Sequence, residues 1–78
     1  MYYGAIFTGM NINDIGGLIR KRRLMLGIDQ RALSEISGIA VHTLSNIEAG
    51  KGNPTVATLA RILDALGMEI RLNVKERE

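Results

Sequence analysis

A short stretch near the middle of the chain, between Gly38 and Pro54, concentrates side chains that form hydrogen bonds without carrying charge. Its apolar residues recur at every third position, which predicts a helix: Val41, Leu44 and Ile47. The uncharged polar residues lie between them: His42, Thr43, Ser45 and Asn46. A helix face that meets only water commonly carries Glu and Lys. This face instead has the chemistry of a surface that recognises another molecule through hydrogen-bond donors and acceptors.

The chain offers little for catalysis or for metal binding. It has no cysteine, which excludes disulfides and thiolate metal sites and fits a reducing cytosol. His42 is the single histidine, so it is a candidate metal ligand, pH sensor or base-reading residue, and the metal role lacks partner ligands. The acidic residues form no convincing active site. We therefore expect no enzymatic activity, no cofactor and no bound metal.

Positive charge is concentrated in the first two thirds of the sequence. The net charge is +2, and six basic residues stand against four acidic ones through Lys51, whereas each sign occurs four times from Arg61 onward. This asymmetry suggests that a polyanion meets the first part of the chain. The basic run 20–23 cannot form one surface, because consecutive helical residues point in different directions. We expect three of its members in solvent: Arg20, Lys21 and Arg22. No apolar run is long enough to span a membrane, and the first residues do not read as a signal sequence.

Four helices must position these side chains. We expect the first over residues 10–27, the second over 29–38, the third from about residue 41, and the fourth over 55–67. Their expected capping and terminating residues are Asn11 or Asn13, Gly27, Asp29, Gly38, Thr55 and Gly67. Because the second and third helices are short and joined by a three-residue turn containing Gly, they form a helix-turn-helix unit.

The buried faces follow from the helical spacing of apolar residues. The residues expected to face inward are Ile12, Ile15, Ile19 and Leu26 in the first helix, Leu33 and Ile36 in the second, and Val56, Leu59, Ala60, Leu63 and Leu66 in the fourth. All three aromatic residues lie within the first seven positions, so the core should be aliphatic. Gly16 costs a helix about 1 kcal/mol relative to Ala, which close approach of another helix would explain.

The end of the chain changes from helical to strand periodicity. In residues 68–75 the apolar side chains alternate strictly with polar ones, at Met68, Ile70, Leu72 and Val74. This pattern predicts a half-buried strand, and a lone strand needs a partner strand to be stable. One candidate is a second copy of the same strand in antiparallel register. Another is the segment "MYYGAIFTG", whose residues have strand propensity but which is alternatively a dispensable extension.

The stretch "LGIDQRALSEISGIAVHTLSNIEAGKGNP" resembles the Xre/phage-repressor family of helix-turn-helix DNA-binding domains. The matching features are Gln30 at the start of the second helix, the Gly in the turn, the "IEAGKGNP" exit and the helix after Pro54. The resemblance covers about residues 11–67, and the strand that follows is similar to that of HipB-like antitoxins. It implies a mainly α, lambda-repressor-like bundle of four helices plus a C-terminal β-strand used in dimerisation. The expected divisions are an N-terminal extension at 1–10, the DNA-binding domain at 11–67 and the dimerisation strand and tail at 68–78.

The resemblance also implies roles for individual residues. The base-reading positions are Val41, His42 and Asn46. The phosphate-contacting positions are Gln30, Arg31, Thr43, Ser45, Lys51 and Asn53. Arg23 and Glu48 are expected to form a largely buried ion pair between the first and third helices. The dimer contacts are expected at Met68, Ile70, Leu72 and Val74. Two positions depart from the family: Ala40 replaces the usual capping Ser or Thr of the third helix, and Asp29 replaces a common Thr.

These features lead to one expected function and one alternative. The first is a cytoplasmic, nucleoid-associated, homodimeric repressor that binds a near-palindromic double-stranded operator. It is expected to autoregulate an operon that also encodes a toxin, such as a HipA-like kinase. The alternative is an interaction module that neutralises a toxin and has little DNA affinity of its own.

Overall fold

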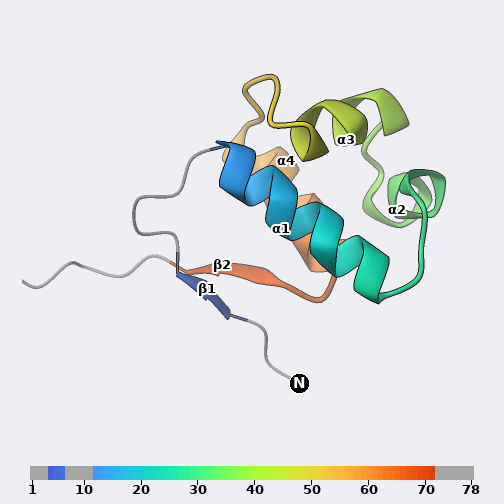
Figure 1. The fold of residues 1–78 in the computed structure, drawn as a ribbon, viewed down its shortest axis with the longest axis horizontal. Coiled ribbons are helices and arrows are strands. Elements are labelled where there is room, and N and C mark those ends of the chain that lie inside the picture. The colour runs from blue at the N-terminus through green and yellow to red at the C-terminus, as the bar shows by residue number, and fades with distance from the viewer. Residues whose placement is uncertain (1–3, 7–11, 72–78) are drawn as a thin grey trace, which may run out of the picture.

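The computed structural model describes residues 4–6 and 12–71, which form four helices and two short strands. Their order is β1 (Gly4–Ile6), α1 (Ile12–Met25), α2 (Gln30–Ser37), α3 (Val41–Glu48), α4 (Val56–Ala65) and β2 (Glu69–Arg71). α3 packs on α1 and on α2, α4 packs on α2, and β2 lies against α4. Figure 1 shows the two strands together on one side of the bundle, away from α3. The predicted mainly helical class, with four helices and a C-terminal strand, is confirmed.

A single aliphatic core holds the helices together. Each of the four helices contributes at least one of the most deeply buried side chains, and the residue after α4 contributes another. They are Ile19, Leu33, Leu44, Ile47, Ile62 and Leu66. Burying a side chain of this size contributes about 1.5–3 kcal/mol through removal of apolar surface from water. None of the described helices has the length and apolar character that crossing a lipid bilayer requires.

Four of the residues expected to face inward lie on the surface instead. Ile36 is 61% exposed and Val56 is 72% exposed, and Ala60 and Leu26 are also exposed. In α2 the inward position next to Leu33 is taken by Ser37, four residues on, whose hydroxyl oxygen accepts a hydrogen bond from the backbone N–H of Ile39 at 3.2 Å. A polar residue thus occupies a core position because its hydrogen bond is satisfied locally.

The other exposed positions have two causes: a rotated face in α4 and the end of α1. The buried side of α4 consists of Leu59, Ile62, Leu63 and Leu66. This set has the spacing i, i+3, i+4, i+7 and turns Val56 and Ala60 toward solvent. Leu26 lies beyond the last residue of α1, in the turn, and therefore does not continue the buried stripe of that helix.

The helix ends follow the predicted capping chemistry. The Asp29 carboxylate accepts from the N–H of Ala32 at 2.8 Å, and the Thr55 hydroxyl oxygen accepts from the N–H of Thr58 at 3.1 Å. Gly27 and Gly38 end their helices with positive φ, as expected. Asn13 lies inside α1 and is therefore not its cap. The other candidate cap, Asn11, falls outside the described residues.

Gly67 turns the chain from α4 into β2. Its φ is +71°, a left-handed conformation that Gly adopts without strain. Its N–H donates to the carbonyl of Asp64 at 3.0 Å, and the N–H of Met68 donates to that of Leu63 at 2.8 Å. Met68 and Leu63 are both buried in the same core cluster, and an apolar contact between these two positions commonly accompanies this kind of helix ending.

β2 finds a strand partner within its own chain. β1 pairs with it in parallel, with Gly4 opposite Glu69 and Ile6 opposite Arg71. The expectation that an N-terminal strand lies beside the C-terminal one is therefore confirmed for residues 4–6, and a second copy is not needed to give β2 its first partner. The predicted alternation is present in the described part, since Met68 is buried and Ile70 is half-buried, whereas Glu69 and Arg71 are exposed. Leu72 and Val74 fall outside the described residues.

Candidate nucleic-acid interface

α3 has one buried face and one open face. Leu44 and Ile47 are at most 2% exposed and form part of the core. The predicted recognition residues lie on the other side, where Val41, His42 and Ser45 are exposed and Thr43 and Asn46 are half-buried. We call these five residues the open face of α3. They share one helix of eight residues, so a single rigid element presents all of them.

The backbones of α3 and α1 come into close contact on the buried face of α3. Gly16 is buried, and a Cβ atom added there would collide with the backbone carbonyl oxygen of Ile47. The next residue, Gly17, is exposed and has nothing within 4 Å of the corresponding position. The close helix approach expected at Gly16 is therefore present, and it requires a residue without a side chain.

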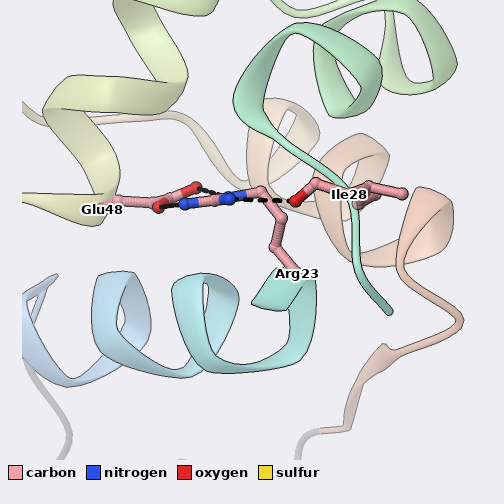
Figure 2. A network of polar contacts seen from close by, with 3 residues as sticks. All are labelled: Arg23, Ile28 and Glu48. Carbon is pink, nitrogen blue, oxygen red and sulfur yellow. Dashed lines mark hydrogen bonds and ion pairs between the residues drawn. The ribbon is translucent and has the colours of Figure 1, made fainter. Parts of the chain in front are cut away.

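The expected pair of Arg23 and Glu48 lies at the far end of the same contact. The Nε and Nη2 atoms of Arg23 donate to the two carboxylate oxygens of Glu48, both at 2.8 Å. Its Nη1 donates to the backbone carbonyl of Ile28 at 3.0 Å. Figure 2 shows the guanidinium between Glu48 on one side and Ile28 on the other. One side chain thus ties α1 to α3 and to the segment that leads into α2.

Burial makes this pair important for stability. The side chains of Arg23 and Glu48 are only 10% and 4% exposed. The hydrogen bonds that Arg23 donates to Glu48 raise the pKa of Arg23 above its ordinary value, while desolvation by burial acts in the opposite direction. A raised pKa on a basic group stabilises the folded state at every pH below the ordinary arginine pKa, and the contribution is lost only as the pH rises through the raised value. The Arg23 side of the pair therefore stays charged at any pH at which proteins are normally handled.

The basic run at 20–23 divides among three environments. Arg20 and Lys21 are exposed, as expected, and Arg23 is buried in the ion pair. Arg22 was expected in solvent, but it is half-buried and its Nε donates to the backbone carbonyl of Leu66 at 2.9 Å. The expectation was wrong because Arg22 faces the end of α4, whose last carbonyls lack partners within the helix and attract a cation.

The loop after α3 brings several predicted contact residues together. The N–H of Lys51 donates to the carbonyl of Asn46 at 2.8 Å, which folds the loop back onto the helix. A hollow of about 190 Å³ lies there, lined by Thr43, Asn46, Ile47, Lys51, Gly52, Asn53 and Pro54. Lys51 and Asn53 are exposed at its edge. A base-reading candidate and three phosphate candidates therefore share one concave surface.

The remaining phosphate candidates lie at the start of α2 and on the open face. Gln30 is the first residue of α2 and half-buried, and Arg31 beside it is exposed. The start of α3 differs from that of α2, because Ala40 provides no side-chain cap. Its first backbone N–H groups therefore lack the local acceptor that Asp29 gives to α2.

One contact within the open face was not foreseen from the sequence. The Nδ2 atom of Asn46 lies 3.3 Å from the Nε2 atom of His42. The spacing of four residues, which places two side chains next to each other on a helix, is the signal that points to it. Within residues 4–6 and 12–71, no three His, Cys, Asp or Glu side chains gather as a metal site.

Comparison with known proteins gives two findings. A model of the helix-turn-helix family HTH_3 matches residues 19–73, which is more than half of the chain. An uncharacterized HTH-type transcriptional regulator of Haemophilus influenzae (strain ATCC 51907 / DSM 11121 / KW20 / Rd) is 36% identical over 65 residues. That match covers 83% of this chain and 65% of the relative, so the chain spans slightly less than two thirds of the relative's length.

Proposed function

The chain belongs to the helix-turn-helix family HTH_3, and from this premise we propose that it is a sequence-specific regulator of transcription that binds double-stranded DNA. The open face of α3 carries the proposal. Its five residues are polar or small and apolar, and none is charged. The similarity of the chain to a relative named as an HTH-type transcriptional regulator supports the same assignment.

In this proposal α3 enters the major groove. Base edges there present donors, acceptors and the thymine methyl group, which uncharged polar and short apolar side chains can match. Val41, His42 and Asn46 read bases, and Val41, 40% exposed, is the side chain suited to a thymine methyl. A carboxylate on this face would repel phosphate, and α3 keeps its single acidic residue, Glu48, in the buried ion pair.

The phosphate contacts come from residues on either side of α3. They are Gln30, Arg31, Thr43, Ser45, Lys51 and Asn53. Contacts of this kind set the register of the protein on the duplex and carry no sequence information directly. Their loss weakens binding to all sequences alike, and loss of the two charged members, Arg31 and Lys51, also reduces the dependence of binding on salt.

The proposed active form is a homodimer on a near-palindromic operator. β1 occupies one edge of β2, and no strand within the described residues occupies the other edge. A second copy of β2 fits that edge in antiparallel register, which satisfies the two-fold symmetry of an isologous dimer. Two α3 helices then bind half-sites about 34 Å apart, one turn of DNA. Met68, Ile70, Leu72 and Val74 supply the apolar contacts of this strand region.

The proposed biological setting is a cytoplasmic, nucleoid-associated repressor that acts on its own operon. The strand after the four helices, similar to that of HipB-like antitoxins, supports an antitoxin role with a HipA-like kinase or another toxin as partner. The test is a gel shift with the promoter of the gene itself, run at several salt concentrations beside a scrambled duplex of equal length. Selective, salt-sensitive binding supports the proposal, and equal binding to both duplexes contradicts it.

A second candidate function is an interaction module with little DNA affinity. The observation that favours it is the number of large apolar side chains left in solvent: Leu24, Met25, Leu26, Ile36 and Val56, each at least 44% exposed. Contiguous exposed apolar surface marks protein interaction sites, and three of these residues, 24–26, are consecutive in the chain. If the protein binds the product of a neighbouring gene but no fragment of its own promoter, this function replaces the first.

The dimer proposal has its own test. Deletion of residues 68–78, or Leu72→Asp, is expected to give a monomer that loses operator binding far more than helical content. Analytical ultracentrifugation and circular dichroism of the same samples measure the two effects. A truncated protein that remains a dimer places the interface on the helices instead.

A further inference from the structure

Two residues of the open face are joined to each other before any DNA is present. His42 and Asn46 lie one helical turn apart in α3, with the Asn46 Nδ2 atom 3.3 Å from the His42 Nε2 atom. The backbone of Asn46 is also held, because its carbonyl accepts the N–H of Lys51 at 2.8 Å. The backbone of Asn46 is therefore held by the loop, and its side-chain amide is held by His42.

The chemistry of the two nitrogen atoms defines the direction of this hydrogen bond. An amide nitrogen has two N–H groups and no acceptor lone pair, so Asn46 must donate. The Nε2 atom of His42 must then accept, which requires a neutral imidazole with its proton on Nδ1. His42 thereby uses one of the two Asn46 N–H groups and leaves the other N–H and the carbonyl oxygen for a ligand.

This arrangement selects one of two otherwise similar orientations. The terminal torsion of an Asn side chain is broad and roughly two-fold, so a free amide exchanges its oxygen and nitrogen positions readily. The bond to His42 holds the nitrogen on the His42 side and the oxygen on the opposite side. Ordering a side chain before binding removes a cost that binding otherwise has to meet.

The groups left on Asn46 match one base. Adenine presents the N7 acceptor beside the N6 donor in the major groove, which is the complement of an adjacent N–H and carbonyl oxygen. Guanine presents two acceptors, N7 and O6, so the carbonyl of Asn46 would lack a donor and face a like partial charge. We infer that Asn46 reads an adenine and that His42, whose Nε2 atom accepts from Asn46, contributes to base reading as a positioning residue that holds the Asn46 amide in the adenine-reading orientation. This inference rests on the DNA-binding function proposed above.

The test measures base preference at one position. The wild-type protein and its variants are incubated with a pool of double-stranded oligonucleotides of randomised sequence, and bound sequences are counted. The variant Asn46→Ala identifies the base pair that Asn46 reads, because preference is lost there and retained elsewhere. His42→Leu then removes the acceptor while keeping bulk, and His42→Gln supplies a carbonyl oxygen that can accept from Asn46. Ser45→Ala, a phosphate-contact variant on the same face, serves as the matched control, and circular dichroism checks the helical content of each protein.

We expect adenine at the base pair that Asn46 reads, preferred by about 5- to 150-fold over the other bases. His42→Leu should reduce that preference to a few-fold, and His42→Gln should restore most of it. Ser45→Ala should weaken binding to all sequences while keeping the adenine preference.

Three results overturn the inference and leave the DNA-binding function intact. They are a base other than adenine at this position, an unchanged adenine preference in His42→Leu, and an equal loss of preference at every position in that variant. The last result assigns His42 a general structural role. A wild-type protein that selects no sequence from the pool contradicts the proposed function itself, and the inference with it.

Discussion

The two faces of α3 are built in opposite ways, although they share the same eight residues. On the buried face, the backbone of Ile47 approaches Gly16 with no room for a side chain, and Glu48 accepts hydrogen bonds from the Nε and Nη2 atoms of Arg23. On the open face, the one side-chain hydrogen bond among the described residues joins His42 to Asn46, both of the same helix. The buried face packs on α1 and on α2, whereas the side-chain hydrogen bond on the open face stays within α3.

This difference separates two kinds of sequence constraint. Residues on the buried face are explained by their contacts within the chain. Shortening an apolar side chain there leaves a void, adding a side chain at Gly16 causes a collision, and removing one member of the ion pair leaves an unpaired charge. Residues on the open face have no such explanation in the fold, and a soluble helix accepts many other side chains there. Their chemistry is therefore best accounted for by a ligand. Substitutions on the two faces should accordingly change different measured quantities, which the following predictions test.

The largest effect is expected from breaking the Arg23–Glu48 pair. Replacing either residue alone, as in Arg23→Met or Glu48→Gln, should lower the free energy of unfolding by about 3–5 kcal/mol, because a buried charge then lacks its partner. Thermal and urea unfolding of the single variants and the double variant measures the loss. The double variant should lose less than the sum of the two single losses. Additive losses would show that the two side chains act independently.

A pair of adjacent glycines gives the next largest effect and supplies its own control. Gly16→Ala should destabilise by about 1–3 kcal/mol, since the new Cβ displaces α3 from α1. Gly17→Ala, one residue on and open to solvent, should instead stabilise by about 0.5–1 kcal/mol by reducing the freedom of the unfolded chain. Urea midpoints of the two variants decide the matter. If both alanines stabilise, α1 and α3 are not as close as the backbone geometry indicates.

Substitutions on the open face should alter binding and leave folding unchanged. Asn46→Ala is expected to weaken binding to the preferred sequence by about 1–3 kcal/mol, with little effect on a scrambled duplex. Lys51→Ala should weaken binding to both duplexes equally and reduce the salt dependence. Fluorescence anisotropy titrations with the two duplexes measure these changes, and thermal melts should show near-native stability for both variants. A large loss of stability in Asn46→Ala would mean that the open face also supports the fold.

The smallest effect concerns the start of α3, compared with the start of α4. Ala40 precedes α3 with φ −57° and ψ 142° and makes no side-chain cap, whereas Thr55 caps α4. Ala40→Ser should therefore stabilise the protein by about 1 kcal/mol, and Thr55→Ala should destabilise it by a similar amount. The melting temperatures of the two variants should shift in opposite directions. No gain from Ala40→Ser would indicate that the N–H groups at the start of α3 already have partners.

Local chemistry made much of this fold predictable. Gly38 and Gly67 at positive φ, and the caps Asp29 and Thr55, follow from rules that involve only neighbouring residues. The cost of Gly16 in a helix likewise pointed to a close contact before the partner was known. The Arg23–Glu48 pair was expected from family resemblance, because two residues so far apart in sequence carry no local signal of their contact.

The errors arose where tertiary packing decides between nearly equal alternatives. Val56 and Ile62 are both apolar, and only the packing of α4 against the rest of the bundle determines which of them is buried. Ser37 occupies a core position, although its polarity argued against burial. Its hydroxyl oxygen accepts the N–H of Ile39, and the sequence did not indicate that this local hydrogen bond compensates for burial. The partner carbonyl of Arg22, on Leu66, depends on how two helices that are distant in sequence pack together.

The pairing of β1 with β2 has a consequence for the order in which the molecule assembles. Gly4 pairs with Glu69, and almost the entire chain lies between them in sequence, whereas each helix is built from contacts between near neighbours. The entropy cost of closing a loop grows with its length, and non-local pairings form late for that reason. We expect the strand pair to form after the helical bundle and to open before it on heating, as a separate low-stability unit. If the dimer is built on β2, the quaternary structure depends on the last part of the chain to fold, and operator affinity should fall at temperatures that leave the helices intact.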